Sequence, residues 1–210
     1  MKPSINKAAA AVCALLFCLS LFAAAAPTAK DAREKTLKDF ISWDKNLKTA
    51  QFSFTQTTDF EGTPINSSQG RLYKDGQKLR LDTIENGKVV QSAFTDKNTI
   101  KIFDDKNRFI MQMSWEDWGK TQVNKALFDF GNYEALLKTH KVKRFEEKED
   151  CYDVVLEPKV EENGSYELEF LLDKKDKFPL EIIISSEGAR TRTKLKDVKK
   201  NVKIDEGALQ

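Results

Sequence analysis

Residues 50–59, AQFSFTQTTD, decide how the rest of the chain is interpreted. Phe52 and Phe54 alternate with Ser53 and Thr55, and this period of two, in a stretch rich in Thr and Phe, is typical of a β-strand with one buried face. Residues 61–64, EGTP, supply turn chemistry, and residues 68–73 have the composition of a returning strand. The segment therefore predicts a β-hairpin.

The same pattern continues in both directions from this hairpin. Asp-Gly and Asn-Gly pairs at 75–76 and 86–87 separate short alternating runs, as tight hairpin turns do. Antiparallel strands are predicted at 50–59, 68–73, 78–83, 88–95, 99–103, 109–115, 142–146, 152–156, 166–172, 180–185 and 190–198. About eleven strands joined by minimal connections favour a mainly β (α+β) fold in a meander, and a sheet of this size usually curls or closes.

Two regions have a helical period instead. Residues 32–47 place Leu37, Phe40, Ile41 and Leu47 at helical spacing between charged residues, which predicts one amphipathic helix. Between Trp115 and His140 the alternation stops and apolar residues recur at helical intervals around Gly131. We therefore expect two short helices inserted between strands.

The first 25 residues have the composition of a signal peptide. Lys2 and Lys7 precede an uncharged apolar run that ends in the small residues 23–26, with expected cleavage after Ala25. A retained membrane anchor is the weaker alternative, because the run is rich in Ala and lacks a following basic cluster. Cys13 and Cys18 lack the preceding small residue of a lipid-modified cysteine. We expect an exported, soluble protein with one domain over residues 26–210.

The composition is poor in the groups that catalysis and metal binding need. The chain has one histidine, His140, and after cleavage one cysteine, Cys151, which argues against a metal site, a cofactor or a catalytic residue. We expect His140 to lie at a solvated helix end. Subtracting Lys2 and Lys7 from 35 basic residues leaves 33, which equals the 33 acidic residues, without the basic stripe of a nucleic-acid binder. Neighbouring carboxylates such as Asp104 and Asp105 are interpreted as turn and surface residues.

Large apolar side chains are abundant by contrast, with 14 Phe among strands that are otherwise charged. On the concave face of a curved sheet such residues fill the core or line a cavity, and the sequence leaves both alternatives open. The residues predicted to face this cavity are Phe52, Phe54, Leu72, Leu79, Leu81, Ile100, Ile102, Met111, Met113, Leu168, Phe170, Ile182 and Ile184.

The order of these elements and several short motifs resemble the LolA family of periplasmic carriers of outer-membrane lipoproteins. The matching segments are F-T-Q at 54–56, G-R-L-Y at 70–73, L-E-P-K at 156–159, and a late hairpin with Pro179, 186–188 and 190–191. Each motif alone has low specificity, whereas their order extends over nearly the whole mature chain. Where the family commonly has an Arg-Pro pair after the G-x-L strand, this chain has Lys74-Asp75-Gly76.

The resemblance implies an incomplete antiparallel β-barrel whose helices form a lid over an apolar cavity for acyl chains. The lid side chains would be Val123, Leu127, Phe128, Leu136 and Leu137. It also implies acylated lipoproteins as cargo, an inner-membrane lipoprotein-releasing transporter as donor and an outer-membrane acceptor, with no cofactor and with the carrier a monomer. The lid-closing arginine of the family has no counterpart here, although Lys74 is a candidate substitute. A lipid- or lipoprotein-sensing module of the same fold is the alternative function.

Overall fold

A computed structural model describes residues 28–121, 130, 132–160 and 165–209. The expected signal peptide and the lid residues Val123, Leu127 and Phe128 lie outside these ranges. The chain divides into two compact units, 1–35 and 36–210. The strands and the candidate site belong to the second unit.

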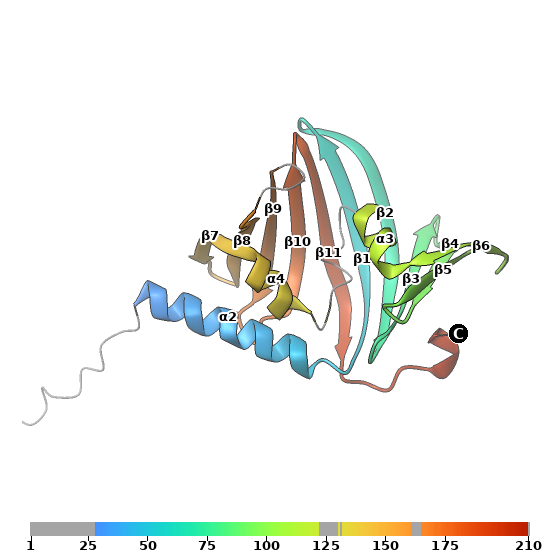
Figure 1. Cartoon of the computed structure of the whole chain (residues 1–210), viewed down its shortest axis with the longest axis horizontal. Helices are drawn as coiled ribbons and strands as arrows, with labels where there is room; N and C mark the ends of the chain where they lie inside the picture. The colour runs from blue at the N-terminus through green and yellow to red at the C-terminus, as the bar shows by residue number, and fades with distance from the viewer. Residues whose placement is uncertain (1–27, 122–129, 131, 161–164, 210) are drawn as a thin grey trace, which may run out of the picture. The chain divides into compact units, whose positions relative to one another are not determined.

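The strands form one antiparallel sheet, as predicted (Figure 1). They are β1 (Thr49–Phe60), β2 (Thr63–Asp75), β3 (Lys78–Glu85), β4 (Lys88–Thr95), β5 (Thr99–Asp104), β6 (Phe109–Ser114), β7 (His140–Glu147), β8 (Cys151–Pro158), β9 (Tyr166–Asp173), β10 (Pro179–Ser186) and β11 (Ala189–Lys200). The described helices are α2 (Ala29–Asn46), α3 (Trp115–Thr121), α4 (Tyr133–Thr139) and the short 3₁₀ helix η2 (Glu206–Leu209).

The strand order is β6-β5-β4-β3-β2-β1-β11-β10-β9-β8-β7, and the sheet of eleven strands does not close on itself. A simple meander would leave β1 and β11 at the edges, yet these two 12-residue strands pair with each other, and Phe54 lies opposite Leu195. The two edges are instead β6 and β7. The segment predicted to hold the lid connects these same two edge strands along the chain, and the open sheet fits an incomplete barrel.

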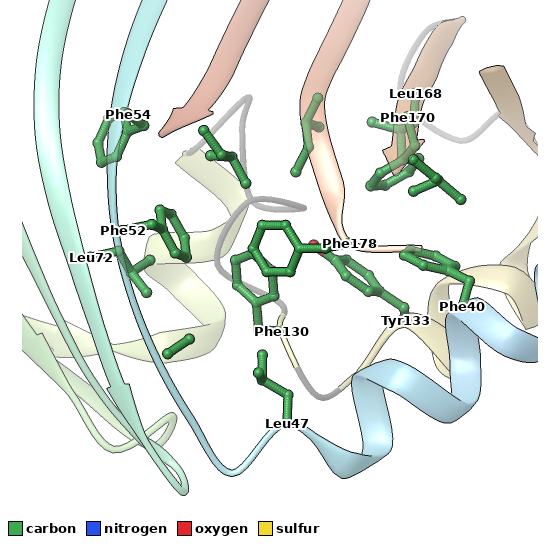
Figure 2. Close-up of a cluster of buried hydrophobic side chains, with 14 of the residues drawn as sticks. Phe40, Leu47, Phe52, Phe54, Leu72, Phe130, Tyr133, Leu168, Phe170 and Phe178 are labelled. Carbon is green, nitrogen blue, oxygen red and sulfur yellow. The ribbon is translucent and has the colours of Figure 1, made fainter. Parts of the chain in front are cut away.

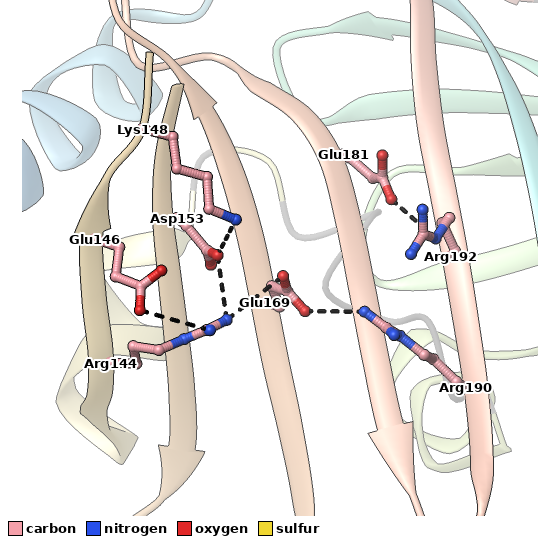
Figure 3. A network of polar contacts seen from close by, with 8 residues as sticks. All are labelled: Arg144, Glu146, Lys148, Asp153, Glu169, Glu181, Arg190 and Arg192. Carbon is pink, nitrogen blue, oxygen red and sulfur yellow. Dashed lines mark hydrogen bonds and ion pairs between the residues drawn. The ribbon is translucent and has the colours of Figure 1, made fainter. Parts of the chain in front are cut away.

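Alternation along the strands separates a largely apolar inner face from a more polar outer face. On the outer face, ion pairs link strands of the β7–β11 half of the sheet (Figure 3). Arg144 Nη2 lies 3.1 Å from Asp153 Oδ2, and Arg190 Nη2 lies 3.3 Å from Glu169 Oε2. Asp153 is fully buried, so this carboxylate depends on its cationic partners much more than an exposed one would.

Helix α2 begins earlier than predicted, at Ala29 instead of residue 32. Thr28 Oγ1 accepts a hydrogen bond from the Asp31 backbone N–H at 3.2 Å, and the Asp31 carboxylate accepts one from the Thr28 N–H at 3.1 Å. This reciprocal pair satisfies backbone donors at the first turn, and the helix extends to it for that reason. The Thr28 hydroxyl also donates to Asp31 Oδ2 at 2.7 Å, and this bond, followed by the one from the Thr28 backbone N–H, lowers the pKa of Asp31.

Gly70 lets β2 pack closely against the Phe54 ring of β1 and against the backbone of β3. A Cβ at this position would lie 2.3 Å from the Phe54 ring and 2.5 Å from the backbone oxygen of Asp82. Both distances are far below van der Waals contact, and a backbone oxygen in a ladder cannot move away cheaply. The glycine of the G-R-L-Y segment therefore allows the Phe54 ring to lie over β2.

Candidate functional site

The centre of the site is an aromatic cluster between the helices and the inner face of the sheet (Figure 2). The ring of Phe40 on α2 stacks on Tyr133 of α4, with centroids 4.9 Å apart, and also contacts Phe170 of β9. Phe130 lies 5.5 Å from Phe52 on β1, in an edge-to-face arrangement. Such geometry adds a favourable quadrupole contribution to the burial of large apolar rings. Helices and sheet therefore meet through side chains that are mainly apolar.

The structure brings nearly all predicted cavity residues to this cluster. Those buried within it are Phe52, Phe54, Leu72, Leu79, Ile100, Leu168, Phe170, Ile182 and Ile184. Leu81, Ile102 and Met113 are partly buried and pack against it. Met111, on the edge strand β6, is 40% exposed. In this closed arrangement the side chains pack against one another, so their role as cavity lining stays a prediction.

Of the predicted lid residues, Leu136 and Leu137 on α4 are partly buried against the same cluster. The sequence analysis did not assign Phe130 and Tyr133 to the site, although both are fully buried within it. Phe178 lies in the turn between β9 and β10, outside the predicted strands, and its ring packs edge-to-face on Trp43 with centroids 4.9 Å apart. Turn residues carry no periodicity, and therefore only their aromatic character hinted at burial.

Two polar contacts fasten the segment from Phe130 to Tyr133 to the rest of the compact unit. Lys97, in the turn between β4 and β5, donates from Nζ to the Phe130 carbonyl oxygen at 2.7 Å. Asp44 on α2 is 2% exposed, and its Oδ2 accepts a hydrogen bond from the Tyr133 backbone N–H at 2.9 Å. Both bonds involve a charged side chain, which makes them stronger than neutral ones. We call Lys97 and Asp44 the latch pair.

Lys74, the candidate substitute for the family arginine, lies elsewhere in this network. Its Nζ donates to the carbonyl oxygens of Leu47 at 3.0 Å and Gly76 at 2.9 Å. Burial lowers the pKa of this amine, and the nearby Lys97 lowers it further, while Asp44 opposes the shift. Lys74 therefore holds the connection between α2 and β1, whereas the latch pair contacts the segment that leads into α4.

His140 lies at the C-terminal end of α4, as expected, but the expectation that this position is solvated is wrong. His140 is 7% exposed, its Nδ1 lies 2.9 Å from the Leu136 carbonyl oxygen, and its Nε2 lies 2.8 Å from the Tyr166 hydroxyl. A carbonyl only accepts, so Nδ1 carries the proton and Nε2 accepts from Tyr166. Burial lowers the pKa of His140, which favours this neutral form. The surrounding lysines misled the sequence interpretation, because β7 turns the imidazole inward.

A hollow of about 580 Å³ lies away from the aromatic cluster, at the shared end of the hairpins. Its walls are Asp59, Gly62, residues 165–167 and residues 185–190. These are mainly polar residues at strand ends and in the adjoining turns, so the hollow is not the predicted apolar cavity. Within the described ranges no group of three or more His, Cys, Asp or Glu side chains could hold a metal ion.

A family model described as outer membrane lipoprotein carrier protein LolA matches residues 45–210. The chain belongs to the LolA family. No curated protein matches the sequence significantly. The family is linked to lipoprotein binding and sorting, and its fold is a binding fold.

Solved structures share the fold at low sequence identity. An uncharacterized conserved protein from Thermus thermophilus is 12% identical, with a TM-score of 0.52 over 85% of this chain and 92% of that one. MucB is 18% identical, with a TM-score of 0.53 over 88% of this chain and 64% of MucB. The chain thus corresponds to less than two thirds of MucB. In the described part of this LolA family chain, no helix is long and apolar enough to cross a membrane.

Proposed function

We propose that this protein is a periplasmic carrier that binds the acyl chains of lipoproteins and escorts them from the inner to the outer membrane. The observation that carries the proposal is the aromatic cluster between α4 and the inner face of the sheet, in a chain of the LolA family. In this proposal Phe130 and residues 132–139 form a cover that can detach from the sheet. An incomplete barrel with such a cover offers an apolar interior without a permanent opening.

The physical need for such a carrier follows from the cargo. Removing one CH₂ group from water is worth about 0.8 kcal/mol, so a long acyl chain resists entering water by roughly 10 kcal/mol. A lipoprotein with more than one chain would not cross an aqueous compartment by itself. A binding partner must therefore cover the chains during transit and release them at the end.

Release requires that the cover separate from the sheet at moderate cost. Segment 130–139 contacts the inner face mainly through rings such as Phe130 and Tyr133, which an acyl chain can replace as apolar neighbours. The directional contacts that such a chain cannot replace include those of the latch pair, Lys97 and Asp44, together with the exposed ion pair between Lys45 on α2 and Glu134 on α4 at 2.8 Å. Cargo entry then exchanges ring contacts for acyl contacts and breaks the latch.

The donor in this proposal is an inner-membrane lipoprotein-releasing transporter, and the acceptor lies at the outer membrane. The protein travels between them as a monomer, after removal of residues 1–25. Family membership supports this route.

Native mass spectrometry tests the proposal after co-expression with a tagged, acylated lipoprotein. The matched control is the same lipoprotein with its lipidated cysteine replaced, so that only the acyl chains differ. A one-to-one complex with the acylated form alone is expected. Equal binding of both forms would show recognition of the protein part and favour the sensing module, and no complex with either would contradict the carrier function.

A further inference from the structure

The inner face is not apolar throughout. Beyond Phe54 on β1 and Leu195 on β11, the inward positions of β1, β2 and β11 carry hydroxyl and amide side chains. Alternation and strand register place on this surface Gln56, Thr58, Asn66, Ser68, Thr191 and Thr193, which we call the neutral patch. Phe54 and Leu195 are buried in the aromatic cluster, so the patch continues directly from the candidate site.

Side-chain contacts confirm that these residues face one another. Thr58 Oγ1 and Thr191 Oγ1 are 3.1 Å apart, and Thr193 Oγ1 donates to Gln56 Oε1 at 3.4 Å. A pair of hydroxyls has two O–H donors, and their mutual hydrogen bond uses one of them. The Thr58–Thr191 pair can therefore donate to an acceptor on a ligand while its own bond stays intact.

The absence of charge in the patch contrasts with the other side of the same strand. The outward residues of β11 that alternate with Thr191 and Thr193 are basic: Arg190, Arg192 and Lys194. Arg190 pairs with Glu169 of β9 and Arg192 with Glu181 of β10 (Figure 3), and Lys194 Nζ lies 4.0 Å from the same Glu181 carboxylate. In a chain with 32% charged residues, every member of the neutral patch is uncharged. Solvent exposure alone would permit charged residues on both faces of the strand, so it does not explain why the inward residues are uncharged.

Part of the patch is also accessible from outside the helices. Asn66 is exposed and Gln56, Thr58 and Ser68 are half-buried, whereas Thr191 and Thr193 are only 7% and 2% exposed. In Figure 1 the ends of β1 and β2 at their shared turn extend past the described helices, as do those of β10 and β11. If the apolar part of a ligand enters the aromatic cluster, the part of the ligand next to it therefore lies against the neutral patch.

We infer that the neutral patch binds the uncharged ester and hydroxyl groups of a glyceride lipid whose acyl chains occupy the apolar part of the inner face. This inference rests on the proposed function and specifies its ligand class. Ester oxygens only accept hydrogen bonds, and the patch supplies hydroxyl and amide donors. A phosphate on the same glycerol is disfavoured, because the patch has no cation to offset the loss of its hydration.

The test compares two lipids with identical acyl chains, dioleoylglycerol and dioleoyl phosphatidate, with pyrene as an apolar probe without hydrogen-bonding groups. The protein is expressed from Met1 and purified as the cell processes it, and displacement of bound pyrene reports lipid affinity. Thr58→Val and Thr191→Val are combined in one variant, because valine keeps the shape and the strand preference. The control combines Thr55→Val and Thr57→Val, which lie on the outward face of the same strand β1.

Wild-type protein should bind dioleoylglycerol more tightly than the phosphatidate. The inner variant should bind dioleoylglycerol roughly five- to tenfold more weakly, the scale of one hydrogen bond, with pyrene affinity and melting temperature unchanged. The outer variant should behave as wild type. Equal affinity for both lipids, together with no effect of the inner variant, would overturn the inference and leave the carrier proposal intact. Failure of pyrene and both lipids to bind would contradict both.

Discussion

Replacing Asp44 with alanine should release segment 130–139 while the sheet stays folded. Asp44 Oδ2 accepts the Tyr133 backbone N–H at 2.9 Å, and Tyr133 is fully buried. A hydrogen bond to a charged group contributes about 1.5–3 kcal/mol. Its loss leaves a buried donor without this acceptor, so the opening equilibrium of the segment should rise by roughly 10- to 100-fold.

Hydrogen exchange measured by mass spectrometry provides the assay. In Asp44→Ala, the amides of α4 should exchange faster by the factor above, while those of β10 around Ile182 keep their wild-type rates and report global stability. Asp44→Asn is the matched control, because it retains an oxygen acceptor of the same shape and loses only the charge. Its effect should be clearly smaller.

The reasoning would be refuted by unchanged exchange of α4 in Asp44→Ala, since the contact would then not limit opening. It would also be refuted by equal acceleration in α4 and β10, because Asp44 would then stabilise the whole unit and not a separable cover. If the latch limits cargo exchange, Asp44→Ala should also take up and lose pyrene faster than Asp44→Asn.

Three further predictions concern other parts of the structure. Gly70→Ala should lower the free energy of unfolding by about 1–3 kcal/mol in urea titration, because its Cβ would overlap the Phe54 ring; an unchanged midpoint would contradict this. The pKa of His140 lies below its ordinary 6.5, so the unfolded chain binds more protons between the two values and stability should fall as pH drops through that window. His140→Gln should reduce the dependence of the melting temperature on pH between 7.5 and 5.5. A variant with the pH dependence of the wild type would exclude the imidazole, the only one in the chain, as its source. Leu81→Asp, at a partly buried position, should weaken pyrene binding more than it lowers the melting temperature; unfolding would instead identify Leu81 as core.

Local chemistry explains why the strands could be predicted from the sequence. Positive φ angles at Asn86, Gly76 and Gly87 are those that tight hairpin turns require, and these residues had identified the turns. Alternation then fixed which residues share a face, as the cluster around Phe52 and Leu72 shows. These signals extend over a few neighbouring residues, which is the range that a sequence pattern can report.

The latch pair could not be predicted in the same way. Asp44 and Tyr133 are 89 positions apart, and neither belongs to a motif that requires the other. Lys97 lies in a turn between two strands, and nothing in its sequence neighbourhood predicts that its Nζ reaches the Phe130 carbonyl oxygen. A contact between a side chain and a distant backbone group leaves no trace in the local pattern, because the backbone partner is the same for every residue type.

The position of the cover follows from the topology. The β1–β11 pairing joins two meanders, β1–β6 and β7–β11, and leaves the edges at β6 and β7. The two meanders are connected at the open side only through segment 115–139, which includes α3 and α4. Since the described helices of this segment, α3 and α4, adjoin the edge strands β6 and β7 in the chain, the proposed opening would break no strand pairing. The gap between β6 and β7 and the proposed cover therefore have one origin, the insertion between the two meanders.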